Sequence, residues 1–319
     1  MSRSKPDVSA LFDLARDGNR PALARLLSLI ERGSDGARQV GALAYPLAGH
    51  GYTVGITGAP GAGKSTLTSA LVGTMRAAEL RLGVLAIDPS SPFTGGAILG
   101  DRVRMQEHAL DDQVFIRSMA TRGHLGGLAL AAPEAVRLLE ATGRDWVIIE
   151  TVGVGQVEVE IAGKSDTTVV VVNPGWGDAV QANKAGLMEI ADVFVINKSD
   201  RAGADDTRRD LEYMLDLSGH TGGEMAWRPP IVSTVATSVE GLDALWVAIQ
   251  DHRAHLERTD ELEPRRRGRT DDELSRIMLA QLTERVRSLR SSEDYEALRT
   301  LVDQRQIDPW EAAARLVGQ

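Results

Sequence analysis

The stretch Gly58-Ala59-Pro60-Gly61-Ala62-Gly63-Lys64-Ser65 is the most informative part of this 319-residue chain. It has the pattern G-x-x-x-x-G-K-S, and it follows the short apolar segment Tyr52-Thr53-Val54-Gly55-Ile56-Thr57, which reads as a strand. In such a loop glycines let successive backbone N–H groups cradle phosphate oxygens, and the start of the next helix adds its positive dipole end. The stretch therefore predicts a P-loop in which Lys64 reaches the β- and γ-phosphates and the Ser65 hydroxyl binds Mg²⁺.

The alternative for this stretch is a glycine-rich loop without a phosphate ligand. The strand before it and the helix-like segment Leu67–Val72 after it disfavour that alternative, because a P-loop requires this context. The residues that we expect to bind the nucleotide here are Gly58, Ala59, Pro60, Gly61, Ala62, Gly63, Lys64, Ser65 and Thr66.

Composition narrows the class of protein. The chain has no cysteine, which excludes disulfides, thiolate metal ligands and thiol nucleophiles and fits a reducing compartment. Its net charge of −9 argues against nucleic acid as a partner. A signal peptide and an apolar run long enough to span a bilayer are both missing from the sequence, so we expect a cytoplasmic protein without a membrane partner.

The middle of the chain alternates strand-like and helix-like segments. Several of the strand-like segments are continuous Val/Ile runs, which is typical of parallel strands that are covered on both faces. The pattern predicts an α/β fold of the P-loop NTPase class, with a mostly parallel doubly wound sheet and ligands at the carboxyl ends of the strands. The expected strands are Thr53–Thr57, Gly83–Asp88, Val114–Ser118, Trp146–Glu150, Thr168–Asn173, Val193–Asn197 and Ile231–Ser233.

Helical extensions flank this region, so we expect an N-terminal extension over residues 1–50, a P-loop domain over 51–255 and a C-terminal arm over 256–319. The basic run Arg265-Arg266-Arg267-Gly268-Arg269 reads as part of a solvated linker, and Thr270 with Glu273 reads as a capping box that starts a helix. A second helix is expected to begin at Asp308-Pro309. The arm carries an apolar stripe that must pack on the α/β domain or on a second chain, and we favour a dimer. The stripe comprises Leu274, Met278, Leu282, Val286 and Leu289.

The segment Asn197-Lys198-Ser199-Asp200 follows an expected strand and has the form N-K-x-D. The Asp200 carboxylate can accept two hydrogen bonds from guanine, and adenine offers no such pair of donors. Asn197 is expected to contact the base edge, and the Lys198 stem is expected to pack along the base face. Downstream of a P-loop, this motif predicts recognition of guanine. The loop after the last strand is expected to add base contacts through Ser233, Thr234 and Val235.

Acidic residues at strand ends are candidates for the Mg²⁺ shell. Glu150 ends an apolar strand and is followed by Gly153, whereas many GTPases have aspartate at this place in the form D-x-x-G. A glutamate can still hold Mg²⁺, directly or through water, and the Gly153 N–H can sense the γ-phosphate. Asp88 and Asp101 are expected to join the shell from loops at the same edge of the sheet, the alternative being ordinary turn or capping chemistry.

The motifs that occur together are the P-loop, Ile87-Asp88-Pro89-Ser90-Ser91, Arg122-Gly123-His124-Leu125-Gly126-Gly127, Glu150-Thr151-Val152-Gly153-Val154-Gly155-Gln156 and Asn197–Asp200. In combination they resemble the MeaB/ArgK family of methylmalonyl-CoA-mutase-associated P-loop GTPases, over nearly the whole chain. The resemblance implies a homodimer joined through the C-terminal extension. It also implies binding of GTP/GDP with Mg²⁺, and a chaperone role in loading and protecting an adenosylcobalamin-dependent methylmalonyl-CoA mutase.

One loop departs from the pattern of that family. The segment Pro174-Gly175-Trp176-Gly177-Asp178-Ala179-Val180-Gln181 stands where relatives more often read P-x-x-G-D-E-L-Q. In relatives this segment resembles a switch that contacts the mutase, so the details of that contact are open here. Trp176 is either an interface anchor or part of the packing of the loop.

Hydrolysis needs charge neutralisation and a positioned water more than covalent chemistry. Lys64 and Mg²⁺ supply the first, but the residue after Gly153 is a valine, so no glutamine directly follows the third motif. Gln156 is the nearby candidate for positioning water, and Arg104 is either a cis arginine or a solvated helix residue. We therefore expect slow intrinsic hydrolysis that a partner accelerates.

Other functions remain as alternatives. A nucleotide-dependent kinase or ATPase linked to basic amino-acid transport is weakened by the guanine motif, and a scaffold that binds nucleotide only for stability stays possible. The six histidines are scattered, which disfavours a nickel chaperone, and His124 reads as structural or switch-related.

Overall fold

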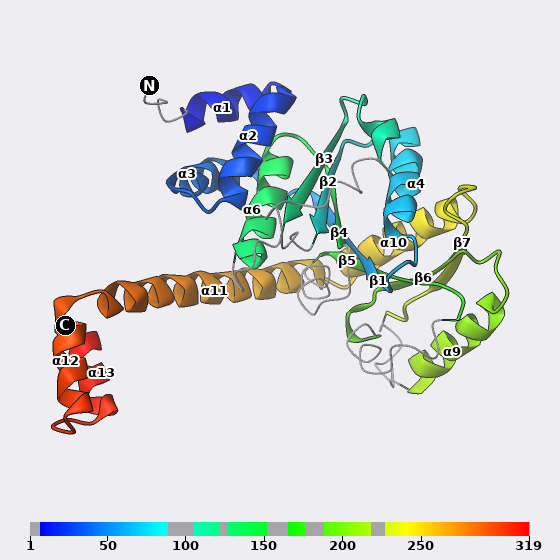
Figure 1. The fold of residues 1–319 in the computed structure, drawn as a ribbon. Helices are drawn as coiled ribbons and strands as arrows, with labels where there is room; N and C mark the ends of the chain where they lie inside the picture. Colours follow the sequence, from blue (N-terminus) through cyan, green and yellow to red (C-terminus); the bar gives the residue numbers. More distant parts are fainter. Residues whose placement is uncertain are drawn as a thin grey trace. The chain divides into compact units, whose positions relative to one another are not determined.

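The computed structural model describes residues 7–88, 105–120, 127–151, 165–175, 188–217 and 227–318. The chain divides into two compact units, Met1–Arg266 and Arg267–Gln319. Figure 1 shows the elements of both units in sequence colours. The predicted nucleotide site falls entirely within the first unit.

The first unit is built on a sheet of seven parallel strands, in the order β3-β2-β4-β1-β5-β6-β7. The α/β fold with a parallel sheet that the sequence predicts is therefore confirmed. β1, which leads into the P-loop, lies in the middle between β4 and β5. The strands are β1 (Tyr52–Gly58), β2 (Leu82–Asp88), β3 (Val114–Ala120), β4 (Trp146–Thr151), β5 (Thr167–Val172), β6 (Val193–Asn197) and β7 (Ile231–Thr234).

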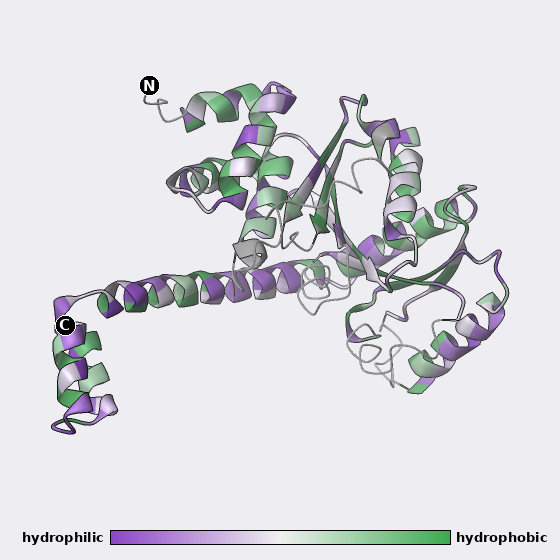
Figure 2. Ribbon diagram, in the orientation of Figure 1, coloured by the Kyte–Doolittle hydropathy of each residue, from purple (hydrophilic) through white to green (hydrophobic). Residues whose placement is uncertain are grey.

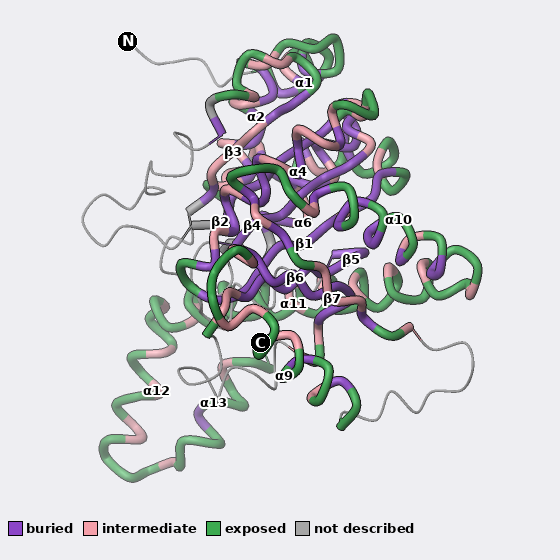
Figure 3. Tube along the Cα trace, turned by 90° about the vertical axis from the view of Figure 1, so that its right-hand side faces the viewer, coloured by how far each residue is buried: buried purple, intermediate pink, exposed green. Residues whose placement is uncertain are grey.

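Helices cover both faces of this sheet, which is why β4, β5 and β6 are buried along their whole length. Every residue of β5, Thr-Thr-Val-Val-Val-Val, is buried, as a parallel strand with two covered faces requires. Figure 3 shows the buried residues concentrated along the strands, and Figure 2 shows the same strands as hydrophobic. The two faces bury two separate hydrophobic clusters.

The two clusters belong to different sets of helices (Figure 1). α4 (Lys64–Ala77), α9 (Ala204–Leu217) and α10 (Leu242–Arg258) pack on one face. On the other face, α6 (Gly127–Ala141) packs together with the N-terminal helices, which the sequence predicts to be an extension. These are α1 (Val8–Arg16), α2 (Arg20–Glu31) and α3 (Asp35–Ala44), followed by the short η1 (Tyr45–Leu47); η2 (Gln106–His108) precedes β3.

The structure corrects the prediction of a linker between the domain and the arm. α10 continues to Arg258, and α11 (Leu262–Arg290) begins only a few residues later, so the basic run Arg265–Arg269 lies inside a helix. Thr270 is consequently inside α11 and does not start it, which makes the predicted capping box wrong. The physical reason is that Arg265 and Arg266 form ion pairs with acidic residues of the first unit, so these charges are not simply solvated.

The second unit contains the rest of α11, α12 (Glu293–Asp303) and α13 (Pro309–Val317). The predicted start of α13 is confirmed, because the Asp308 carboxylate accepts hydrogen bonds from the backbone N–H groups of Trp310 and Glu311. No residue of α11 or α12 is buried, and α11 is mainly hydrophilic (Figure 2). Among the helices that the structure describes, none combines the length and the apolar character needed to cross a membrane.

Candidate nucleotide-binding site

The P-loop connects β1 to α4, and its glycines are required by close contacts. A Cβ atom at Gly58 (φ +137°) would lie 1.9 Å from the carbonyl oxygen of Val171 in β5, and a Cβ at Gly63 (φ +89°) would lie 2.6 Å from Nδ2 of Asn197. Any other residue at Gly58 would have to push two central strands apart. The glycines that the motif places at these positions therefore let the loop lie against β5 and β6.

The start of α4 has the properties of an anion site. Its N-cap is Gly63, which offers no side-chain cap, so the first N–H groups of the helix face the loop with the positive end of the helix dipole. Lys64 is 7% exposed and donates hydrogen bonds to the carbonyl oxygens of Gly58 (2.9 Å) and Ala59 (3.0 Å). Its ammonium group thus lies over the loop where phosphate oxygens would bind.

Ser65 and Glu150 meet at the ends of α4 and β4. The Ser65 hydroxyl donates to a carboxylate oxygen of Glu150 at 2.5 Å, and Glu150 is fully buried. The donor set is a hydroxyl and a carboxylate, which are oxygen ligands of the kind that Mg²⁺ prefers. The residues present therefore fit the predicted metal. The described residues contain no cluster of three or more His, Cys, Asp or Glu side chains that could hold a metal ion by themselves.

The guanine motif follows β6 and contacts the P-loop directly. Asn197 is 2% exposed, and its amide donates to the carbonyl oxygen of Ala62 at 2.7 Å. Its side-chain oxygen accepts from the Thr234 hydroxyl and from the backbone N–H of Ala236, both at 3.2 Å. Asn197 thus clamps the P-loop to the loop after β7, a positional role that the sequence analysis did not assign to it.

The next residues of the motif are placed differently. Lys198 adopts a left-handed backbone conformation (φ +59°) and donates to the carbonyl oxygen of Gly61 at 2.6 Å, so its stem crosses the P-loop. Ser199 donates from both its backbone N–H and its hydroxyl to the carbonyl oxygen of Thr234. Asp200 is exposed. An exposed carboxylate next to a rigid clamp is suited to accept hydrogen bonds from a ligand.

The clamp uses backbone atoms of Ala62, a predicted phosphate-binding residue, and of Ala236 in the loop after β7; the contacts of these atoms with Asn197 were not predicted from the sequence. Ala236 directly follows the predicted base-contacting residues Ser233, Thr234 and Val235. Among those three, Thr234 joins the clamp, Val235 donates its N–H to the carbonyl oxygen of Glu240, and the Ser233 hydroxyl accepts from Arg208.

Other predicted residues lie at the same edge of the sheet or outside the described residues. Thr66 is in the first turn of α4, and Asp88 ends β2, which places its backbone at the carboxyl edge. The structure does not describe the side chain of Asp88, so its role as a Mg²⁺ ligand stays a prediction. The same holds for the residues that lie wholly outside the described ranges, namely Asp101, Arg104, His124, Gly153, Gln156 and Trp176.

Comparisons of the sequence with known proteins agree on one family. The family model described as "Methylmalonyl Co-A mutase-associated GTPase MeaB" matches residues 23–291. A "Putative GTPase" of Pyrococcus abyssi is 50% identical over 312 residues, which is 98% of this chain and 96% of the relative. "GTPase ArgK" of Escherichia coli is 40% identical over 248 residues, covering 76% of this chain and 74% of that protein.

A more distant relative and a solved structure extend the comparison. The mouse protein "Methylmalonic aciduria type A homolog, mitochondrial" is 38% identical over 216 residues, which is 67% of this chain and 52% of the mouse protein. The crystal structure of an "LAO/AO transport system kinase" superposes with a TM-score of 0.72 at 27% identity, over 100% of this chain and 99% of the other.

Proposed function

Because the chain belongs to the MeaB family of P-loop GTPases, we propose that it is a GTP-hydrolysing chaperone for an adenosylcobalamin-dependent methylmalonyl-CoA mutase. In this role it assists loading of the cobalamin cofactor and protects the loaded enzyme. GTPase activity and binding of guanine nucleotides follow from the family. The mutase as client is the further step, and it is supported by the description of the family as mutase-associated.

The observation that carries nucleotide recognition is the Asn197 clamp. Asn197 joins the P-loop at Ala62 to the loop after β7 at Thr234 and Ala236, so phosphate binding and base binding share one rigid frame. Asp200 stands exposed beside that frame and accepts the guanine N1–H and N2–H groups. The predicted choice of GTP over ATP rests on this pair of acceptor oxygens.

Hydrolysis transfers the γ-phosphoryl group to water, so that the bond to the β-phosphate breaks and GDP and phosphate leave. Lys64 and the first N–H groups of α4 neutralise charge on the phosphates as it shifts toward the leaving oxygen. Ser65 and Glu150 would hold Mg²⁺, which supplies further charge neutralisation when bound. Asp88 and Asp101 stay predicted members of that shell.

Slow intrinsic turnover is part of the proposal. Gln156 and Arg104, which lie outside the described residues, stay the predicted candidates for positioning the water molecule and for charge stabilisation. We propose that the mutase completes the site, which is how partners accelerate many P-loop GTPases.

A homodimer joined through the C-terminal arm completes the proposal. Leu274, Met278, Leu282 and Val286 recur along one side of α11, and each is about half exposed. A stripe of this kind in the second unit supports a surface that a second copy covers. Light scattering on the wild-type chain should give a dimer, and Leu282→Glu should give a monomer with unchanged GTPase activity. A monomeric wild-type chain would refute this part of the proposal.

The deciding experiment measures GTP turnover by the purified protein alone and with the adenosylcobalamin-dependent mutase, with ATP as the control nucleotide. We expect turnover below the roughly 1–100 s⁻¹ that is typical of kinases, and acceleration by the mutase with GTP only. Tight GTP binding without acceleration would refute the mutase as the client while leaving the GTPase intact. Acceleration with ATP would favour the alternative function, a kinase or ATPase linked to transport of basic amino acids.

A further inference from the structure

The edge of the sheet opposite the P-loop contains two buried carboxylates. Asp166 precedes β5 and is 1% exposed, and Asp192 precedes β6 and is 9% exposed. A buried carboxylate is stable only when cations or hydrogen-bond donors surround it. Both carboxylates find such a cation in the first two turns of α11.

Arg266 binds the carboxylate at the start of β5. Its Nε and Nη2 atoms donate to the two carboxylate oxygens of Asp166 at 3.1 and 3.0 Å, which is the bidentate geometry that favours arginine. Nη1 donates to the carbonyl oxygen of Gly49 (2.9 Å) and Nη2 to that of Gly51 (2.7 Å). Burial by itself would lower the pKa of Arg266, but the hydrogen bond and the charge of Asp166 outweigh it and raise that pKa.

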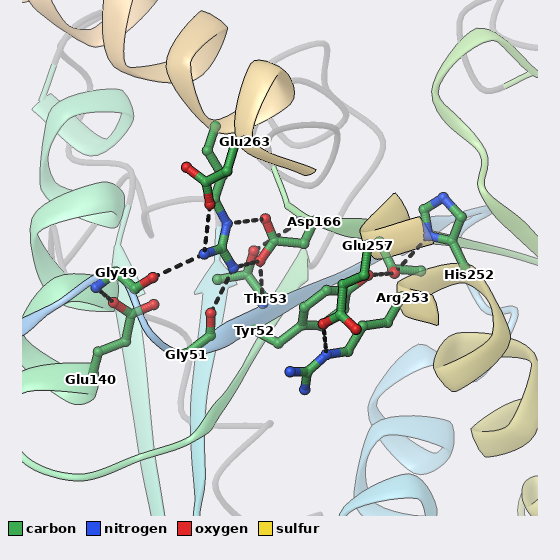
Figure 4. Close-up of polar contacts among 12 residues, drawn as sticks. Gly49, Gly51, Tyr52, Thr53, Glu140, Asp166, His252, Arg253, Glu257 and Glu263 are labelled. Carbon is green, nitrogen blue, oxygen red and sulfur yellow. Dashed lines mark hydrogen bonds and ion pairs between the residues drawn. The ribbon is translucent and has the colours of Figure 1, made fainter. Parts of the chain in front are cut away.

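Several segments converge on this position. Figure 4 shows Asp166, Thr53 and the Gly49–Gly51 turn around one cluster of polar contacts, with Glu140 of α6 beside it. The Thr53 N–H donates to Asp166 at 2.8 Å, and the Asp166 N–H donates back to the Thr53 hydroxyl at 2.8 Å. Glu140 accepts from the Gly49 N–H at 2.6 Å. Arg266 therefore ties α11 to the starts of both β1 and β5.

Arg265 makes the corresponding contact at the start of β6. Its Nη1 lies 3.1 Å from Asp192, and the same carboxylate oxygen lies 3.2 Å from Nε2 of the buried His252. The other ring nitrogen of His252 shares a hydrogen bond with the Thr167 hydroxyl (2.8 Å), which in turn shares one with the Tyr52 hydroxyl (2.7 Å). This relay connects α11 and α10 to the first residues of β1, β5 and β6.

The same three strands carry the P-loop at their other ends. β1 runs directly into the loop at Gly58. β5 accepts a hydrogen bond from the Ala59 N–H through the carbonyl oxygen of Val171 at 3.1 Å. β6 ends at Asn197, which binds the carbonyl oxygen of Ala62. The strands that α11 holds at one edge are therefore the strands that position the phosphate-binding loop at the other.

We propose that Arg265 and Arg266 form a nucleotide-linked anchor, in which the docked start of α11 and the nucleotide-bound P-loop stabilise each other. The anchor has two states, docked and released, and release leaves Asp166 and Asp192 buried without their arginine partners. Linkage requires that nucleotide favour docking by the same factor by which docking favours nucleotide. Because α11 continues as one helix to Arg290, a partner bound to its distal part can act on nucleotide affinity through this anchor.

The wild-type protein allows a test without any substitution. Amide hydrogen exchange of residues 262–268 is measured without nucleotide, with Mg-GDP and with a non-hydrolysable GTP analogue. We expect saturating nucleotide to slow exchange at these amides by about fivefold or more, the lower range of ordinary coupling energies. Unchanged exchange at nucleotide saturation would overturn the anchor.

Variants test the reciprocal effect on a fluorescent GDP analogue. Arg266→Lys keeps the charge but loses the bidentate contact, and Arg265→Ala removes the more exposed of the two contacts. We expect Kd to rise by about tenfold for Arg266→Lys, and by less for Arg265→Ala. Arg267→Ala is the matched control, because Arg267 is an exposed member of the same basic run, and its Kd should stay within about twofold of wild type.

The outcomes separate the anchor from the proposed function. The inference rests on nucleotide binding at the P-loop and does not depend on which client the protein serves. If Arg266→Lys and Arg265→Ala both fold and bind with the wild-type Kd, the anchor is refuted while the GTPase stands. A wild-type chain that does not bind guanine nucleotide would instead refute the site itself.

Discussion

The two edges of the central sheet are stabilised by different kinds of group. At the carboxyl edge, short contiguous motifs supply backbone amides, carbonyl oxygens and glycines, as in Gly58–Ser65 and Asn197–Asp200. At the amino edge, charged side chains from distant parts of the chain meet, and the Arg266–Asp166 contact spans 100 residues. Phosphate binding therefore depends on residues that are neighbours in the sequence, whereas the support for the strands that carry the phosphate-binding loop comes from long-range contacts.

The physical origin of this difference is the geometry of each task. Phosphate binding needs successive N–H groups that point to one centre, and only neighbouring residues in a tight loop can provide them. Fixing the starts of parallel strands needs a cation that reaches several strands at once, and an arginine from any later helix can supply it. Substitutions at the two edges should therefore differ in how far they change the free energy of unfolding, nucleotide binding and turnover.

The largest effect is expected for Arg266→Ala at the amino edge, which should lower the free energy of unfolding. Arg266→Ala leaves the Asp166 carboxylate buried without its arginine, and removing one partner of a buried pair costs about 3–5 kcal/mol. Urea unfolding should show a fall of that size in the free energy of unfolding. Arg267→Ala, the exposed neighbour, should change it by less than about 0.5 kcal/mol. Equal effects of the two substitutions would mean that the amino edge does not depend on this contact.

Lys64→Ala tests the carboxyl edge by activity. The ammonium group lies over the P-loop carbonyls, and removing one preorganised donor from a transition state costs about 10²–10³ in turnover. GTP hydrolysis by the mutase-stimulated protein should fall by that factor, while the far-UV circular dichroism spectrum stays that of wild type. Retained turnover would show that the phosphate charge is neutralised by other groups.

Two residues of the guanine motif, Asn197 and Asp200, are expected to differ in their effects on stability and on nucleotide choice. Asn197→Ala removes the buried clamp and should lower both nucleotide affinity and the free energy of unfolding, the latter by about 1–3 kcal/mol. Asp200→Asn changes an exposed carboxylate, so stability should stay unchanged while the preference for GTP over ATP falls by about 10- to 100-fold. Competition binding and urea unfolding measure both quantities. A stability loss for Asp200→Asn would contradict the assignment of separate roles.

The smallest expected effect is on the pH dependence of stability, through Asp192 at the amino edge. Burial acts to raise the pKa of Asp192, but the contacts with His252, Arg265 and the Thr168 N–H outweigh it, so the pKa is lowered. A lowered carboxyl pKa contributes stability that is present above the unfolded pKa of about 3.9 and is lost as pH falls through the folded value.

Urea midpoints from pH 6 to pH 3 measure this dependence in wild type and Asp192→Asn. The variant should lose less stability on acidification, because it lacks the titrating group. Burial raises the pKa of Glu140 and the Arg76 hydrogen bond lowers that of Asp111, but both groups are present in both proteins, so the difference isolates Asp192. Parallel curves would show that Asp192 does not contribute through its charge.

The predicted fold followed from local patterns, and every predicted strand end lies within two residues of the observed end. Continuous apolar runs such as β5 required two covered faces, and the P-loop required a strand before it and a helix after it. The basic run Arg265–Arg269 was misread as a linker because charged residues without a visible partner are most often solvated. Their buried partners, Asp166 and Asp192, lie far away in the sequence.

The α/β class, the P-loop, the guanine motif and the family could all be inferred from the amino-acid sequence. Each of these depends on residues close together in the chain, where spacing alone fixes the geometry. The three-dimensional structure was needed to see that Asn197 clamps two loops together, that the Ala236 N–H joins this clamp, and that Arg265 and Arg266 hold the start of α11. Those contacts join residues tens to hundreds of positions apart, and their existence depends on which strands become neighbours when the sheet forms.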